Sequence, residues 1–308
     1  MNWKNDPPGP DFIGHLTNGI FRNMDIRRNH RDMTPEQKKG FITALLVLKN
    51  ITPSVLRPGL QHRYDDFVQI HKNFMGPGTP AVPNPHRSPL FFPWHRILIR
   101  QFELELQAAV GDPSLTLPYW NWSMSGANDP FTDDFMGRDG DPNHDQRVTF
   151  GAFALDKGLY AVRIWDNDEE GGDAGVRRNF GAQGLLPSSA DLESVSAKTP
   201  YWSVPDGWAN LLEGMHDEVS SWVGGNMTSA ASPNDPIFFL HHCHLDFLWE
   251  QWKSRHPAEA PFSFHENASP EMYGTRLVFH LDSEPAPWAT DWKVKQVLDS
   301  KALGYAYG

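Results

Sequence analysis

Cysteine is almost missing from this chain of 308 residues, because Cys243 is the only one. No disulfide can form within the chain, so packing and bound ligands must hold the fold. Iron–sulfur clusters and the usual structural zinc sites need several thiolates and are excluded. A single cysteine fits a reducing compartment, and residues 1–25 lack a basic start followed by an apolar stretch. We therefore expect a cytoplasmic protein, or one that is exported together with a partner.

Positive charge is also scarce. Lys and Arg number 27 against 38 Asp and Glu, which gives a net charge of −11. Such an acidic chain is a poor partner for nucleic acid or for an anionic membrane surface. No apolar run approaches the roughly 18 residues that a membrane span needs, so we expect no membrane partner. The hydrophobic share of 39% still allows a substantial buried core.

The apolar residues recur at helical spacing in five segments. Thr34, Pro35 and Gln37 form a capping box that starts the first helix, which ends before Pro53. Apolar residues three and four positions apart predict four more helices, at about 61–74, 94–109, 206–222 and 236–254.

The remaining segments read as loops. Six prolines make residues 76–93 a loop, and residues 111–206 are rich in Gly, Asp, Pro and Asn. Short strands are expected at 160–165 and near 276–281. The sequence therefore predicts an irregular extension over residues 1–25. It predicts one mainly α domain over residues 26–308, with long loops and a few short strands.

Histidine is plentiful where cysteine is absent, and it lies beside apolar helix faces. The positions are His71, His95, His216 and His242 on four expected helices, and His86 in the proline-rich loop. Inward-facing histidines in a helical bundle make a natural metal cage. A lone histidine of this kind is more often structural, but the group together favours a metal.

The chemistry of the group favours copper. Imidazole ligands without thiolate suit copper, which binds most tightly among the first-row divalent ions. The chain has no HExxH motif, and only Glu213 precedes one of these histidines, His216, at ExxH spacing. A thermolysin-like zinc site and a di-iron bundle are therefore disfavoured.

Several blocks resemble the tyrosinase family of type-3 copper proteins, in its short bacterial type. They are RYDDFVQIH, HRSPLFFPWHR, LPYWNW, WVGGNM and SPNDPIFFLHHCHLDFLWEQW. The resemblance implies a four-helix bundle with two copper ions, each held by three histidines. It implies that O2 is used to oxidise phenols or o-diphenols to quinones. It assigns the first copper to His71, His86 and His95, and the second to His216 and His242. It makes His241 the neighbour of a ligand and not itself one.

One ligand of the family pattern is missing. The family has H-x-x-x-H on the fourth helix, but Ser220 stands four residues after His216. His244 would restore the number of histidine ligands to three, yet a residue two positions from His242 faces another way on a helix. The second copper is then two-coordinate from the protein, weakly held or completed by water. A natural serine and an engineered one are both compatible with the sequence.

Other departures concern proton transfer and the surroundings of the ligands. Relatives that oxidise monophenols often have Asn after the first ligand of the second copper, where this chain has Asp217. Asp217 and Glu213 are candidate bases, or solvated helix carboxylates. Asp246 could orient an imidazole or pair with a basic residue on the helix surface. Asn84 replaces the cysteine that forms a thioether in fungal and plant relatives.

These features favour an oxidase that uses O2 to convert o-diphenols or o-aminophenols to quinones or quinone imines. Ortho-hydroxylation of monophenols is a second expected activity. The alternative is a non-catalytic copper- or O2-binding protein, impaired at Ser220. No long C-terminal domain follows the bundle, so we expect an open site or a helper protein that loads copper.

Overall fold

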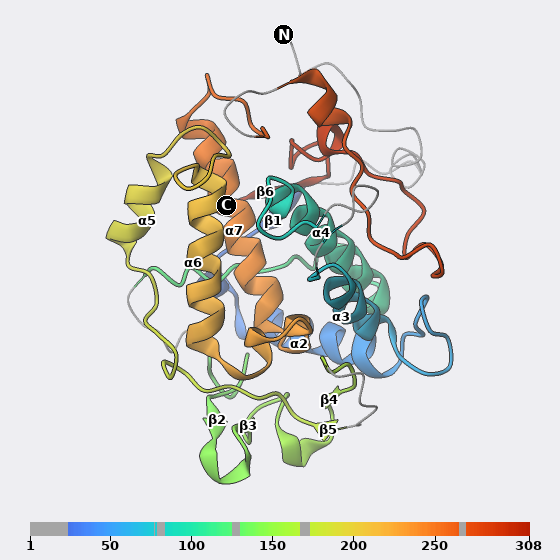
Figure 1. Cartoon of the computed structure of the whole chain (residues 1–308). Coiled ribbons are helices and arrows are strands. Elements are labelled where there is room, and N and C mark those ends of the chain that lie inside the picture. The colour runs from blue at the N-terminus through green and yellow to red at the C-terminus, as the bar shows by residue number, and fades with distance from the viewer. Residues whose placement is uncertain (1–23, 77, 79–83, 125–129, 167–172, 265–268) are drawn as a thin grey trace.

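The computed structural model describes residues 24–76, 78, 84–124, 130–166, 173–264 and 269–308. Most of the predicted extension over residues 1–25 lies outside these ranges. The described residues form six α-helices, labelled as in Figure 1: α2 Pro35–Asn50, α3 Arg63–Asn73, α4 Phe91–Val110, α5 Ser189–Ser196, α6 Trp208–Val223 and α7 Ile237–Arg255. The mainly α fold expected from the sequence is confirmed.

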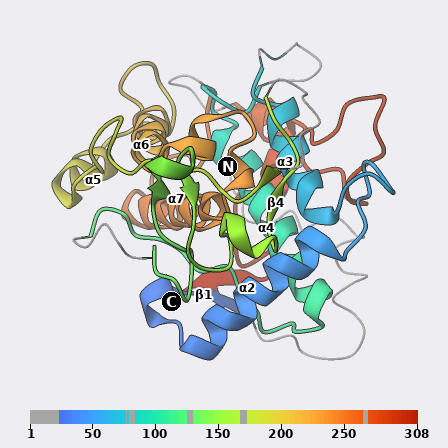
Figure 2. The same ribbon diagram turned by 90° about the horizontal axis from the view of Figure 1, so that it is seen from below.

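Four of these helices form the central bundle. Helices α6 and α7 lie side by side in Figure 1, next to α3 and α4, and α4 contacts both α6 and α7. Seen from below in Figure 2, α2 runs across the outside of this group, where it packs on α3 and α4. Aromatic rings fill the contacts: Trp208 of α6 lies 4.7 Å from Phe92 of α4 and 5.0 Å from Trp252 of α7, between ring centroids.

The strands are short and pair in three small sheets. Strand β1 (Asp25–Arg27) runs parallel to β6 (Tyr305–Tyr307), so the two ends of the described chain meet. Strand β2 (Gly140–Asp141) pairs with β3 (Arg147–Val148), and β4 (Ala161–Val162) pairs with β5 (Asp173–Ala174), both antiparallel. Single 3-10 turns occur at His30–Asp32, Pro142–His144, Leu155–Lys157, Gly225–Thr228, Ser232–Asn234, Pro270–Gly274 and Val294–Gln296.

Three expectations about local structure were wrong. Helix α4 begins at Phe91 and not near 94, because Pro93 fits within a first turn, where its missing N–H is not needed. Helix α5 was missed in the long loop region, although Ser188 and Asp191 form a capping box before it. Near 276–281 the described residues make only one isolated bridge, Arg276 to Lys293, and no strand. Leu277 and Phe279 are buried, and backbone hydrogen bonds join Leu277 to Trp292 and Val294 to Thr275. The pairing stops there because Val294–Gln296 forms a 3-10 turn.

Candidate metal centre

Three histidines converge in the interior of the bundle. His71 comes from α3, His86 from the loop before α4 and His95 from the first turns of α4. One ring nitrogen from each lies within 4.8 Å of the others, and in the described part of the chain no other group of histidine, cysteine or acidic residues is as close. The structure thus brings together the three residues that the resemblance assigned to the first copper.

The backbone fixes the orientation of each of these rings. His71 Nδ1 lies 2.8 Å from the carbonyl oxygen of Ala230, and His95 Nδ1 lies 2.8 Å from that of Phe91. His86 Nδ1 lies 3.3 Å from the carbonyl oxygen of Phe74. All three Nε2 atoms are buried and make no hydrogen bond. Carbonyl acceptors at Nδ1 leave Nε2 as the lone-pair donor, which is the state that a metal requires.

Burial also keeps the imidazoles neutral. Desolvation lowers the pKa of His71 to about 4, against a smaller opposing effect of the Ala230 carbonyl. Desolvation and the charge of the neighbouring histidines hold the pKa of His86 and of His95 well below the usual range. Neutral imidazoles can bind a metal without first releasing a proton. The fit to a nitrogen-ligated copper is therefore good at this position.

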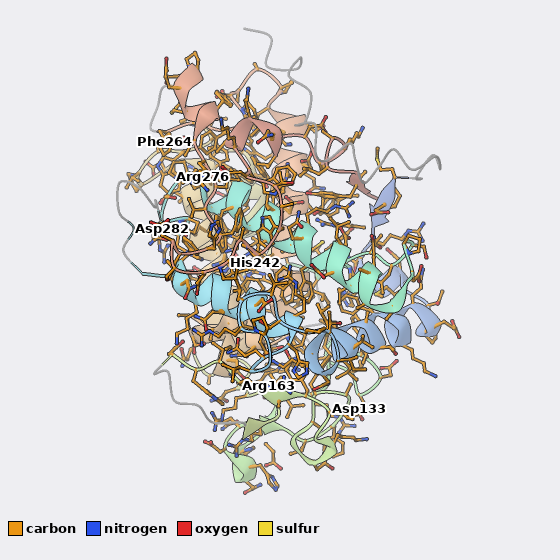
Figure 3. The ribbon with its side chains drawn as sticks, turned by 90° about the vertical axis from the view of Figure 1, so that its right-hand side faces the viewer. Asp133, Arg163, His242, Phe264, Arg276 and Asp282 are labelled. Atoms are coloured by element: carbon orange, nitrogen blue, oxygen red, sulfur yellow. The ribbon has the colours of Figure 1, made fainter. Side chains whose placement is uncertain are left out.

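A second group of histidines adjoins the first. His242 of α7, labelled in Figure 3, is 1% exposed. Its ring is 4.4 Å from that of His95 and 4.9 Å from that of His216, between centroids. Both ring nitrogens of His242 are buried without a hydrogen bond. Phe91 and Phe238 pack against rings of both groups. The centroid of Phe91 lies 5.1 Å from that of His216, and the centroid of Phe238 lies 4.9 Å from that of His71. The two groups adjoin in one aromatic-walled interior, with His216 partly exposed at its edge.

The candidate acids lie at the outer edge of this second group. Glu213 is buried, and its Oε1 accepts a 2.6 Å hydrogen bond from the Arg87 backbone N–H, while Oε2 is without a partner. Desolvation raises the pKa of Glu213 to about 8. Asp217 is more exposed, and it accepts hydrogen bonds from His216 Nδ1 at 3.0 Å and from the Arg87 guanidinium. Burial raises the pKa of Asp217, but these contacts and charges outweigh burial and lower it.

The structure corrects the interpretation of Asp246. Its carboxylate neither reaches a candidate ligand nor lies on the surface, because its exposure is only 3%. It accepts hydrogen bonds from Arg96 Nε at 2.6 Å and from the hydroxyl groups of Tyr305 and Tyr307, and Arg27 lies 3.5 Å away. His244 faces away from His242, as expected, and its ring lies 5.3 Å from that of Trp122.

Sequence reasoning missed two features of the site. Arg87 contacts both candidate acids, Glu213 through its backbone and Asp217 through its side chain, and no motif marks this role. Asn84, which replaces the thioether cysteine of some relatives, accepts a 2.8 Å hydrogen bond from the His86 N–H and so shapes the loop that carries this histidine. An Asn two residues before a loop histidine could have suggested this turn.

Comparison with known proteins decides the family. Residues 61–255 match the profile described as the common central domain of tyrosinase. The chain belongs to the tyrosinase family. A tyrosinase from Streptomyces glaucescens is 36% identical over 293 residues, which cover 91% of this chain and 97% of that protein. Grixazone synthase from Streptomyces griseus is 34% identical, over 76% of this chain and 86% of its own length.

Solved structures agree on the fold. A polyphenol oxidase from Thermothelomyces thermophila superimposes with a TM-score of 0.67 at 19% identity, covering 92% of this chain and 88% of that one. A functional unit of octopus hemocyanin superimposes with a TM-score of 0.62 at 20% identity, over 92% of this chain and 68% of its own. These likenesses support the helical bundle core.

Membership of the tyrosinase family settles the broad chemistry. The chain is an oxidoreductase of the tyrosinase type, a type-3 copper phenol oxidase, and its cofactors are two copper ions. Among the described helices, none combines the length and the apolar character that crossing a bilayer would take.

Proposed function

We propose that His71, His86 and His95 hold one copper ion and that His216 and His242 hold the other. The observation that carries the first assignment is the set of three buried Nε2 atoms without hydrogen bonds, each on a ring whose Nδ1 faces a backbone carbonyl. For the second, His242 offers two unpartnered ring nitrogens, and His216 lies 4.9 Å from it. When bound, the copper pair supplies the redox chemistry that passes electrons from a phenol to O2.

The protein contributes a rigid and dry frame. The carbonyl groups of Ala230, Phe74 and Phe91 would hold the first three imidazoles in one tautomer. Phe238 lies 4.1 Å from the ring of His242 and 4.9 Å from that of His71, between centroids, and so it excludes water between the two groups. A low-dielectric interior of this kind strengthens the effect of any charge placed in it.

We further propose that the substrate is an o-diphenol or an o-aminophenol, which reaches the site beside His216. The side chain of His216 is 12% exposed, whereas His71, His95 and His242 are at most 3% exposed as residues. Two relatives are named tyrosinase and grixazone synthase, so the family accommodates more than one product. An o-diphenol gives up two electrons and two protons and leaves as the quinone, and one O2 accepts the electrons of two such substrates.

Glu213 and Asp217 would serve the harder reaction, the ortho-hydroxylation of a monophenol, by accepting its phenolic proton. The two acids differ in their suitability. Asp217 is held by His216 and Arg87 with a lowered pKa, which makes it a weak base. Glu213 has a pKa of about 8 and a free Oε2, so it can take up or release a proton near neutral pH. Glu213 is therefore the better candidate.

A helper protein would load the copper, either in the cytoplasm or during export of the pair. The support is the burial of the inner histidines, since His71, His95 and His242 are at most 3% exposed and a hydrated copper ion would have to lose its water shell to reach them. Uptake from a Cu(I) carrier protein that is faster than uptake from free Cu(I) at equal activity would support this proposal. Equal rates would contradict it.

The test of the function combines metal analysis with O2 consumption. We expect the copper-loaded protein to hold two coppers per chain and to consume one O2 for every two catechols oxidised. Copper binding without catechol turnover would favour the alternative of a non-catalytic copper protein. The absence of bound copper would overturn both.

A further inference from the structure

His241 is a buried histidine that has no assigned role. It lies on α7 directly before His242, its exposure is 0%, and neither Nδ1 nor Nε2 makes a well-formed hydrogen bond, although the backbone of His216 interacts with the ring. A polar group buried without a partner is destabilising, so such groups are rare unless something else satisfies them. Among the described residues, the Nε2 atoms of His71, His86 and His95 share this condition, and these are candidate metal ligands.

The ring of His241 lies at the distances that a shared metal requires. Its centroid is 5.0 Å from that of His216 and 5.4 Å from that of His242, and the latter two are 4.9 Å apart. In the first group the corresponding distances are 4.9, 5.1 and 5.7 Å. Two imidazoles that bind one ion at about 2.0 Å with tetrahedral angles have centroids about 5 Å apart. The second group therefore has ring spacings like those of the first, but its ring nitrogens do not all lie within 4.8 Å of one another, so the rings must reorient to converge on one ion.

The second copper site lacks one histidine ligand of the family pattern, and His241 could take its role. Family members use two histidines one turn apart on the helix that corresponds to α6, and this chain has His216 followed by Ser220. Ser220 is buried, and a neutral hydroxyl is a poor copper ligand. Helix α6 thus offers one imidazole to the second copper, and α7 must offer two if that ion is to have three.

His244 does not meet the same conditions, although it is equally buried on the same helix and its ring nitrogens are also unpartnered. Its ring faces Tyr119 at 5.7 Å and Trp122 at 5.3 Å, away from His216 and His242. The contrast between two similar histidines shows that burial alone does not place a ring in the cluster. It also provides a matched control.

We propose that His241 is the third protein ligand of the second copper, with His216 and His242, and that it compensates for the serine at position 220. This proposal rests on the proposed assignment of His216 and His242 to that copper. Neighbouring residues on a helix diverge by about 100°, so His241 and His242 would approach the ion from different sides. Their rings are inclined by 65° to each other, which fits this approach.

The test is copper binding in a set of four variants, measured as copper per chain after equilibration with a competing chelator. In His241→Gln the dissociation constant of the second copper should rise roughly tenfold or more, while the first copper stays bound. His244→Gln, the matched control, should bind both coppers like the parent protein. Ser220→His should restore the family's ligand pair, and in that background adding His241→Gln should leave both coppers bound.

The double variant separates ligation from folding. If Ser220→His rescues the second copper in the His241→Gln protein, then His241 acts as a ligand and not through packing. If the second copper is lost in the double variant as well, with thermal unfolding unchanged, the proposal is wrong. It is also wrong if His241→Gln keeps both coppers with the parent's affinity, although the proposed oxidase function would then stand. A parent protein that binds no copper would instead overturn the proposed function and this proposal with it.

Discussion

Asp246 of α7 and Arg96 of α4 form a buried ion pair, with Arg96 Nε donating to Asp246 Oδ1 at 2.6 Å. Arg96 follows His95 directly, and Asp246 lies one helical turn after His242. The pair therefore ties together the two helices at the level of their metal-site histidines, whose rings are 4.4 Å apart between centroids. Arg27 and the hydroxyl groups of Tyr305 and Tyr307 complete the surroundings of the carboxylate, so the two terminal strands also join this network.

The first prediction is that Asp246→Asn destabilises the protein by about 3–5 kcal/mol at pH 7, because it leaves a buried guanidinium unpaired. Burial raises the pKa of Asp246, but Arg96, Arg27 and the tyrosine hydroxyls outweigh burial and hold it below its ordinary value. The folded state thus binds fewer protons than the unfolded state as the pH falls below about 4. The stability from this carboxylate is complete above that pH and is lost as the pH falls through the folded-state pKa.

Urea unfolding at several pH values measures this effect. The difference in free energy of unfolding between the parent and Asp246→Asn should be constant from roughly pH 5 to 7, where the carboxyl is fully ionised. It should shrink below about pH 4. Asp282→Asn is a suitable control, because Asp282 is exposed at the edge of the molecule (Figure 3). A difference that stays the same down to acid unfolding would contradict the role of the charge.

The second prediction concerns the first copper. His95→Ala should remove at least one copper equivalent, because it deletes one of three converging Nε2 atoms. Elemental analysis of the copper-loaded protein gives the stoichiometry directly. His144→Ala is the control, since the His144 side chain is 55% exposed and its Nδ1 lies 2.8 Å from Asp141 Oδ2, outside the histidine cluster. An unchanged copper content in His95→Ala would refute the assignment.

The third prediction is that o-diphenols and o-aminophenols are oxidised faster than monophenols are hydroxylated. A diphenol needs only to lose electrons and mobile protons, whereas a monophenol must also be deprotonated and positioned for oxygen insertion. Initial rates of O2 consumption with catechol, 2-aminophenol and tyrosine at saturation provide the comparison. The interpretation fails if the tyrosine rate exceeds the catechol rate.

The fourth prediction separates the two candidate bases. Glu213→Gln should lower the monophenol rate by roughly 100-fold and the catechol rate much less, because proton removal limits only the former. Asp217→Ala should have a smaller effect on the monophenol rate, since Asp217 is already held by His216 and Arg87. Glu218→Gln, at an exposed position of the same helix, is the control. Equal losses on both substrates in Glu213→Gln would point to a structural role.

Helices and candidate ligands could be predicted because their signals are local. Apolar spacing marked α3, α6 and α7 to within two residues, and the same spacing put His71 and His242 on inward faces and His216 at the border of one. The role of Asp246 could not be predicted, because its partners Arg27 and Tyr307 come from the two ends of the chain. Arg87 was missed for a similar reason: its contacts to α6 depend on how a loop packs 130 residues away from Asp217.

The carbonyl groups that contact His71, His86 and His95 fix the orientation of these rings when the chain folds, before any ion binds. Such a cradle gains affinity because little conformational entropy is lost when an ion arrives. The same rigidity does not make the site selective for one metal, since three neutral imidazoles at these spacings suit zinc as well as copper. The general order of affinity among divalent metals favours copper over zinc but does not exclude zinc. The identity of the metal in this position is thus decided largely by which ion the cell delivers, and expression in zinc-rich, copper-poor medium should yield a folded protein carrying the wrong metal.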